Sequence, residues 1–317
     1  MEIRAVALNV KWGFDPERIS RFLEAAKKLR PLTVRVSVTT PPREGVRQTL
    51  KALEELGVEY AAIGIYEGDD LEELVRTYGV FAAVGSVDRY LEFLRRVEKQ
   101  GEPHLARNVA LLLGGVVYDS PYYPATAVKN EGVALSLLYP DDLESLDDVA
   151  AVLGSAERLG EAFASSVGER FLGVDGSLSP WGERSVARAI ERLFGVKVGT
   201  WGTHSAIRAL NEAIWSSGVR LVGFSEVMLP LAEDEELKRL VEGGALDLQK
   251  LVSYTSTCVA GLDMVPIEAD EKALRRMLLD LEAIAKSKGR AVGVRVFPAS
   301  GQYFDVPGFG KTPVLRP

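Results

Sequence analysis

The chain has one cysteine, two histidines and no long uninterrupted apolar run among its 317 residues. A single cysteine excludes an intrachain disulfide, which fits a reducing cytoplasm. The N-terminus carries charges at Glu2 and Arg4 and lacks the apolar core of a signal peptide. Val109–Tyr118, the most apolar later stretch, is about half the ~20 residues of a spanning helix. We therefore expect a cytoplasmic protein with no membrane segment.

Basic residues are outnumbered by acidic ones. Lys and Arg number 38 against 45 Asp and Glu, so the formal charge is −7 at pH 7. An acidic chain without a long basic run is a poor match for a phosphate backbone, and we expect no nucleic-acid partner. Asn and Gln number only four each beside many Arg and Glu, a trend of heat-adapted proteins, so the composition predicts a thermophilic source.

Short apolar runs alternate with longer amphipathic stretches almost from end to end. This alternation is typical of strands covered by crossover helices, and it predicts an α/β fold. The expected strands are Ile3–Val10, Leu32–Val38, Val58–Ile65, Val80–Val84, Val109–Val117, Val133–Tyr139, Phe171–Val174, Val196–Val198, Leu221–Met228 and Ala291–Phe297. The expected helices are Pro16–Leu29, Arg43–Leu56, Ser86–Lys99, Leu146–Gly168, Pro180–Phe194, Thr203–Ser216 and Asp270–Ser287.

Capping residues agree with these boundaries. Asp15 and Ser179 each precede a proline at a first helical position, and Gly195 stands where a helix should stop. No Gly/Ser-rich or Pro-rich linker divides the chain. We therefore expect one domain over residues 1–317, with the tail 298–317 packing on the barrel.

The strand count bears on the architecture. Ten strands at about thirty residues per βα unit need roughly 300 residues, whereas an eight-stranded TIM-like barrel typically needs ~250. The count slightly favours a larger barrel or a long open sheet, although one wrong strand removes the difference. In all these layouts ligands bind beyond the carboxyl ends of the strands, so polar residues there are the first candidates.

Four blocks carry a family resemblance: DSPYYPA (Asp119–Ala125), VDGSLSP (Val174–Pro180), GTWGT (Gly199–Thr203) and CVAGLDMVP (Cys258–Pro266). As a set they resemble DUF711, a widespread prokaryotic family of unknown function whose fold is similar to that of pyruvate formate-lyase and other glycyl radical enzymes. The resemblance runs from about Arg107 to the C-terminus. It implies a closed ten-stranded α/β barrel with an inserted finger loop, which would carry Cys258.

The resemblance does not extend to radical chemistry. Glycyl radical enzymes carry a C-terminal Arg-Val-x-Gly-Tyr type motif, whereas this chain reads RVFPASGQY over Arg295–Tyr303. Fold does not fix function, so a glycyl radical activity is not supported. The sequence leaves the cofactor and any metal open.

Three residues are candidate catalytic groups. Cys258 is a nucleophile or thiyl carrier if a cation or helix end lowers its pKa, and otherwise a small buried hydrophobe. Asp263 stands in an apolar run as a general base or as a turn carboxylate. Glu226 interrupts the apolar run Leu221–Met228, so we expect it to point into the barrel, the alternative being an ion pair with an arginine.

Polar residues near strand ends are candidates for substrate binding. Asp175 and Ser177 follow an apolar strand and could orient a substrate hydroxyl or form an Asx-type turn. Thr203 begins a helix whose free N–H groups could hold an anion, or it is a plain N-cap. Asn9 and Ser120 are added for their positions.

His204 lies in the first turn of the same expected helix, where the dipole favours a neutral base, although a surface role is the more common one. Glu233–Glu236 is expected to be a solvated acidic first turn. We expect an enzyme acting on a small polar metabolite in a central cavity by acid–base or thiol chemistry. The alternatives are a non-catalytic metabolite-binding or regulatory protein and a structural assembly protein, and pairing into a homo-oligomer is compatible with each.

Overall fold

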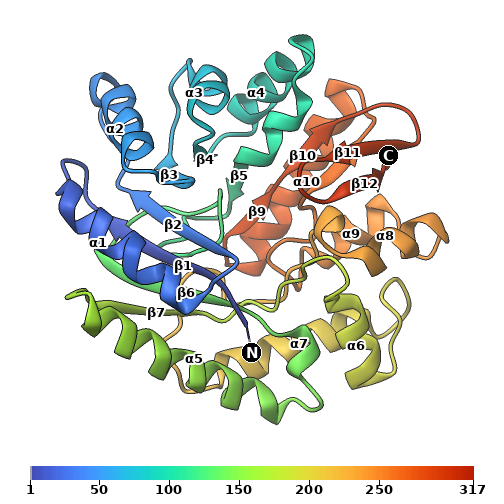
Figure 1. Ribbon diagram of the computed structural model, residues 1–317. Coiled ribbons are helices and arrows are strands. Elements are labelled where there is room, and N and C mark those ends of the chain that lie inside the picture. Colours follow the sequence, from blue (N-terminus) through green and yellow to red (C-terminus); the bar gives the residue numbers. More distant parts are fainter. Residues whose placement is uncertain (1) are drawn as a thin grey trace.

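Seven of the expected apolar runs become neighbouring strands of an eight-stranded sheet. The structure is a computed structural model that describes residues 2–317 (Figure 1). In spatial order the strands are β7 (Phe171–Asp175), β6 (Gly132–Leu138), β1 (Glu2–Val10), β2 (Thr33–Val38), β3 (Tyr60–Ile65), β4 (Phe81–Val84), β5 (Val109–Leu113) and β9 (Val292–Val294). Strands β1–β5 are parallel, whereas β6, β7 and β9 run the opposite way.

Helices ring the strands on the outside (Figure 1). They are α1 (Pro16–Ala26), α2 (Arg43–Glu55), α3 (Leu71–Tyr78), α4 (Val87–Lys99), α5 (Asp147–Ser166), α6 (Val186–Phe194), α7 (Thr203–Trp215), α8 (Glu235–Glu242), α9 (Leu248–Tyr254) and α10 (Glu271–Lys288). Side chains alternate between the two faces of a strand. Val6, Leu8 and Val10 of β1 accordingly pack in the same core as Ile19 and Phe22 of α1.

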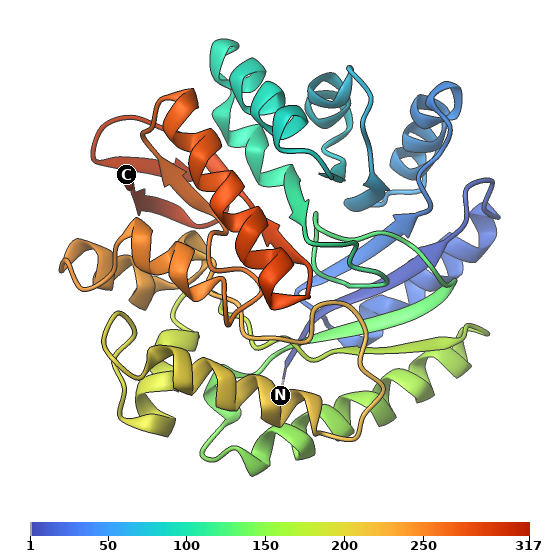
Figure 2. The same cartoon turned by 180° about the vertical axis from the view of Figure 1, so that it is seen from behind.

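The other face of the sheet carries small residues and is covered by chain without regular structure. Ala83 of β4 and Ala110 of β5 pack there with Tyr122, Phe224 and Met228. Figure 2 shows the segment between β5 and β6 crossing this interior. Small side chains on the inner face leave room for these crossing segments, whereas the helix-facing side is filled by larger aliphatic residues.

Backbone hydrogen bonds continue beyond both edges of the sheet. Val174 of β7 accepts a bond from Val222 N (3.0 Å) and donates to Arg220 O (2.9 Å). At the other edge, Gly293 N of β9 donates to Val259 O (3.2 Å), and Val259 N donates to Val227 O (3.2 Å). Extended segments of residues 220–229 and 259–262 therefore link β9 to β7 without forming continuous strands.

Several sequence predictions of elements are wrong. Val196–Val198 forms a turn between α6 and α7, and Leu221–Met228 contains only isolated bridges. Ala291–Phe297 is divided between β9 and β10 (Val296–Pro298), and β10 pairs with β8 (Val265–Ile267). The tail contains a hairpin of β11 (Tyr303–Val306) and β12 (Gly310–Pro313).

The start of α6 also differs from the prediction. Ser179 does not cap this helix, because its hydroxyl is bonded to Arg4 and Tyr122. The helix begins at Val186, and Ser185 caps it by accepting from Arg188 N. Asp15 and Gly195 do occupy the cap positions that the sequence predicts.

Candidate functional site

A partly enclosed cavity lies where strands β1–β5 begin. Its lining includes Arg4 of β1, Arg35 of β2, Tyr60 of β3, Phe81 of β4 and Arg107 just before β5. We had expected carboxyl ends of strands to surround a ligand. Because β6, β7 and β9 run against the other five, their carboxyl ends meet the amino ends of β1–β5 at this one opening.

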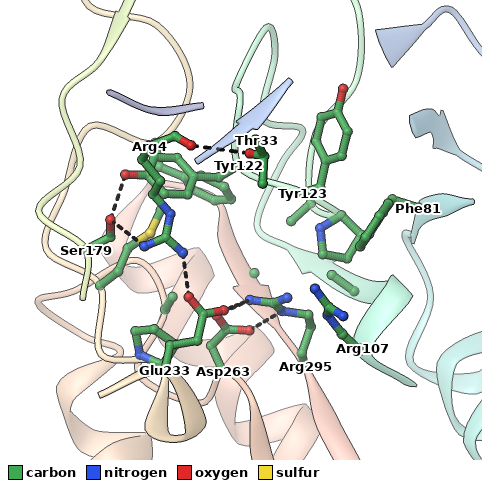
Figure 3. A pocket seen from close by; sticks show the side chains of 18 of the residues that line it. Arg4, Thr33, Phe81, Arg107, Tyr122, Tyr123, Ser179, Glu233, Asp263 and Arg295 are labelled. Carbon is green, nitrogen blue, oxygen red and sulfur yellow. Dashed lines mark hydrogen bonds and ion pairs between the residues drawn. The ribbon is translucent and has the colours of Figure 1, made fainter. Parts of the chain in front are cut away.

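Four buried charges form a chain along one wall of the cavity (Figure 3). Arg4 Nη2 lies 2.5 Å from Glu233 Oε2, and Arg295 Nη2 lies 3.2 Å from Glu233 Oε1. Arg295 also holds Asp263 in a bidentate pair, with Nε–Oδ1 and Nη2–Oδ2 distances of 2.6 and 2.7 Å. Cations and anions alternate, so these four charges cancel.

The two carboxyls of this chain titrate differently. Burial alone would raise the pKa of Glu233, but Arg4 and Arg295 on its two sides hold it below the usual range. Burial raises the pKa of Asp263, and Arg295 only opposes that rise. Glu233 is therefore the firmer anion, while Asp263 is the carboxyl closer to taking up a proton.

Two further arginines in the lining have no carboxylate partner within residues 2–317. Arg35 is 8% exposed; its Nε donates to Thr33 Oγ1 (2.8 Å) and its Nη1 to Pro121 O (2.6 Å). Burial, helped by the nearby charge of Arg4, lowers the pKa of Arg35 to about 10. Arg107 makes no ion pair or hydrogen bond with the described chain, and it points into the cavity (Figure 3). With two acids against four arginines, the lining carries a net charge of +2.

Aromatic rings form the wall beside Arg35. The rings of Tyr60 and Phe81 stack with centroids 6.1 Å apart and planes at 22°. Tyr123 continues this wall, with its centroid 5.6 Å from that of Phe81. Arg35 lies over the Tyr123 ring at 5.0 Å and over the Tyr60 ring at 5.7 Å. The cavity therefore combines cations with flat apolar surface.

A second aromatic group surrounds Arg4. Its guanidinium lies 4.9 Å from the Trp181 ring centre and 5.3 Å from that of Tyr122. Phe309, from the turn between β11 and β12, contacts Trp181 edge-on at 5.1 Å. Tyr122 Oη and Ser179 Oγ are 2.8 Å apart, and burial raises the pKa of Tyr122 to about 12, so this phenol stays neutral.

Of the residues singled out from the sequence, Asp263 lines this cavity. Asp175, Ser177 and Ser120 lie together instead in a buried hydrogen-bonded group. Asp175 accepts from Ser120 Oγ (2.6 Å), Ser177 Oγ (2.6 Å) and the N–H groups of Phe224 and Ser225 (3.0 Å each). All of its oxygens are occupied by protein donors, which is the arrangement of a structural carboxylate.

Gly223 makes this group possible. Its φ is +66°, and a Cβ there would come within 2.0 Å of Asp175 Oδ2. Only glycine permits the crossing segment to approach the carboxylate so closely while adopting a left-handed conformation.

Glu226 and Cys258 are linked through Lys288. Lys288 Nζ bonds to Glu226 Oε2 (2.5 Å) and to Cys258 O (2.6 Å), and Arg290 Nε lies 2.5 Å from Glu226 Oε1. Glu226 and Cys258 are both 0% exposed, and neither lines the cavity. Burial raises the pKa of the Cys258 thiol to about 12, an environment that does not favour a thiolate.

The remaining sequence candidates also lie outside the cavity lining. Thr203 donates to Thr200 O (2.8 Å) at the start of α7. His204 contacts Thr257 Oγ1 (2.9 Å) and Ser253 Oγ (3.2 Å) of the neighbouring segment. Asn9 donates to Asp119 Oδ1 (3.0 Å).

The acidic run at Glu233–Glu236 is not a solvated turn as predicted. Glu233 is paired with two arginines in the cavity, and Asp234 is fully buried. Asp234 caps α8 by accepting from Glu236 N and Leu237 N, and it also accepts from Val186 N of α6. Glu233 is held by arginines, and Asp234 is held by the N–H groups of two helix ends. Sequence spacing alone does not reveal these contacts.

Sequence reasoning missed the cavity arginines, although a signal was present. Arg4, Arg35 and Arg295 interrupt apolar strand runs, as Glu226 does. A charge within a buried strand is costly unless it is paired or faces a polar space. Applied to both signs of charge, this argument would have pointed to three of the four arginines.

Residues 2–317 contain no group of three or more His, Cys, Asp or Glu side chains placed to hold a metal ion. In the same range, no helix has both the length and the apolar character needed to cross a bilayer.

Comparison with known proteins gives one family. A family model described as "Uncharacterised ACR (DUF711)" matches residues 142–304, about half of the chain. The match includes Glu233, Asp263 and Arg295, whereas Arg4, Arg35 and Arg107 precede it.

Curated relatives carry the description UPF0210 protein. One from Methanocaldococcus jannaschii is 33% identical over 173 residues, which are 50% of this chain and 38% of the relative. One from Campylobacter concisus is 34% identical over 209 residues, 60% of this chain and 47% of the relative. One from Limosilactobacillus reuteri is 31% identical over 191 residues, 55% of this chain and 43% of the relative. The chain thus spans less than half the length of these relatives.

Proposed function

The chain belongs to the DUF711 family, and we propose that it binds a small organic anion in the cavity at the start of β1–β5. The observation that carries the proposal is Arg35, a buried guanidinium that faces the cavity without a carboxylate partner in the described chain. A buried unpaired cation is costly, and a bound anion would compensate its charge. Arg107 adds a second cation that makes no hydrogen bond or ion pair within residues 2–317.

Thermal unfolding with added ligands tests this function. We expect benzoate to raise the melting temperature of the parent chain and the uncharged isostere benzamide to leave it unchanged. An anion present at 100 times its Kd stabilises the folded state by about 2.7 kcal/mol. The shift should largely disappear in Arg35→Gln. It should persist in Arg158→Gln, which replaces an exposed arginine of α5 bonded to Ser155. Equal shifts with benzoate and benzamide would contradict anion binding.

A second candidate is acid–base catalysis on the bound anion by Asp263. Its carboxyl lines the cavity, and burial raises its pKa above the ordinary value of an aspartate. Asp263→Asn keeps the shape of the side chain. If Asp263 moves a proton, this variant should bind the anion while losing turnover of it. Turnover by this variant at the parent rate would contradict proton transfer by Asp263.

We also propose that the eight-stranded sheet and the segments 220–229 and 259–262 form one closed barrel similar to that of pyruvate formate-lyase. The hydrogen bonds that continue from β7 and β9 into these segments support the closure.

A cytoplasmic location, a homo-oligomer and a thermophilic source also remain proposals. The single cysteine supports the first, and the low Asn and Gln content supports the third. Size-exclusion chromatography with light scattering tests the second, and a melting temperature in the ordinary mesophilic range would contradict the third.

A further inference from the structure

We infer that the anion is a planar dicarboxylate, with one carboxylate bound by Arg35, the other by Arg107, and its flat body lying on Tyr60 and Phe81. This inference deepens the proposed function and rests on it. It states the number of anionic groups, their chemistry and the shape of the part that joins them.

The number of anionic groups follows from the charges of the lining. Arg4 and Arg295 are ion-paired with Glu233 and Asp263, so their charges are already compensated. Arg35 and Arg107 form no ion pair with a carboxylate of residues 2–317, although the charge of Glu233 acts on both from a greater distance. Arg35 Nη2 in particular donates to no acceptor there, although Nε and Nη1 both do. Two cations free for a ligand match two negative charges.

The separation of the two anionic groups follows from the order of the strands. Arg35 lies on β2 and Arg107 immediately precedes β5, with β3 and β4 between them. Three strand spacings of about 4.8 Å place the two backbones roughly 14 Å apart. Both side chains extend into this space, which favours one anionic group at each end of a ligand over two on the same atom.

The flat body follows from what lies between the two cations. Tyr60 on β3 and Phe81 on β4 fill the interval, and their rings are nearly parallel at 22°. Tyr123 extends this surface from the segment that crosses the interior. A planar conjugated group can make edge-to-face or offset contacts with these rings that a flexible aliphatic chain cannot.

Carboxylates fit the cavity better than phosphate groups. Guanidinium groups bind carboxylates and phosphates alike in bidentate geometry, so the choice depends on the other donors of the cavity. Phosphate sites commonly add backbone N–H groups of a helix N-terminus. Within residues 2–317, no first-turn residue of an α-helix lines this cavity, and Asp234 already occupies the free N–H groups of α8.

Calorimetric titration at fixed ionic strength tests the inference with four compounds: terephthalate, benzoate, adipate and phenyl phosphate. We expect terephthalate to bind at least tenfold more tightly than benzoate, which has one carboxylate, and more tightly than adipate, which is flexible. In Arg107→Gln the terephthalate and benzoate affinities should converge, and Arg35→Gln should weaken terephthalate at least tenfold. Arg158→Gln is the matched control and should bind as the parent does.

The outcomes separate this inference from the proposed function. If benzoate binds as tightly as terephthalate, the second carboxylate subsite is wrong while anion binding stands. If adipate equals terephthalate, the flat body is wrong, and if phenyl phosphate binds most tightly, the carboxylate chemistry is wrong. If none of the four binds, the proposed function fails as well. If Arg35→Gln does not fold, Arg107→Gln still tests the second carboxylate subsite, because Arg107 is only half-buried.

Discussion

Cys258 is sealed within the protein, with an exposed fraction of 0%, and burial raises the pKa of its thiol to about 12. We therefore expect the folded chain to react negligibly with Ellman's reagent at pH 8, because thiolate is scarce and the reagent cannot reach the sulfur. In 6 M guanidinium chloride one thiol per chain should react. Stoichiometric labelling within seconds under native conditions would contradict this placement and reopen thiol chemistry.

His204 gives a prediction about pH. Partial burial lowers its pKa below the ordinary value of 6.5, so the unfolded chain takes up this proton first as the pH falls. The stability that neutral His204 contributes is therefore present above pH 6.5 and declines on acidification toward its folded pKa. We expect His204→Gln to show a smaller drop in melting temperature between pH 7.5 and 5.5 than the parent.

His104→Gln is the matched control for that experiment, since His104 is the other histidine and is exposed. It should follow the pH dependence of the parent chain. A drop for His204→Gln as large as that of the parent would show that His204 does not contribute to the acid sensitivity.

The candidate site was predicted from the sequence only where polarity inside an apolar run was noticed. Asp263 was identified in this way and lines the cavity. Arg35, surrounded by valines in β2, carries the same signal with opposite charge. Arg107 carries no such signal, because it precedes its strand, and its role depends on which strands lie between it and Arg35. That order is set by long-range pairing and cannot be read from local sequence.

At the level of single elements, Ser185 shows how one capping side chain sets a helix boundary. Ser185 accepts from Arg188 N and caps α6, so we expect Ser185→Ala to lower the free energy of unfolding by about 1 kcal/mol. Denaturant titration measures this change. Ser20→Ala in α1 is the control, because Ser20 is an exposed helical serine whose hydroxyl donates to Pro16 O within its own helix. Equal effects of the two variants would contradict the capping role.

Long amphipathic helices and strands with apolar runs were predicted well, because burial sets the spacing of the apolar residues along each element. The run Val196–Val198 misled because one buried valine in a turn imitates the alternation of a strand. The run Leu221–Met228 is apolar because it crosses the interior, yet Gly223 and Ser225 have positive φ values that interrupt ladder pairing. Burial was predicted correctly there, and backbone geometry was not.

At the level of the whole molecule, the hydrogen bonds across the gap between β7 and β9 give a test of closure. The amides of Val222, Val259 and Gly293 donate in these links. We expect them to exchange with solvent as slowly as the amides of β6, because a closed barrel opens only with its global core. Hydrogen exchange followed by NMR measures this. Exchange as rapid as that of the exposed turn at Trp201 would indicate an open sheet.

One consequence follows from where the tryptophans lie. Trp181 lines the cavity against Arg4 and Phe309, whereas Trp12 and Trp201 are 51% and 101% exposed. Indole emission depends on the charge and polarity next to the ring, so entry of a guest beside Arg4 would alter the emission of Trp181. External quenchers such as iodide would silence the two surface indoles first. The chain thus provides an intrinsic optical reporter for screening compounds without any attached dye.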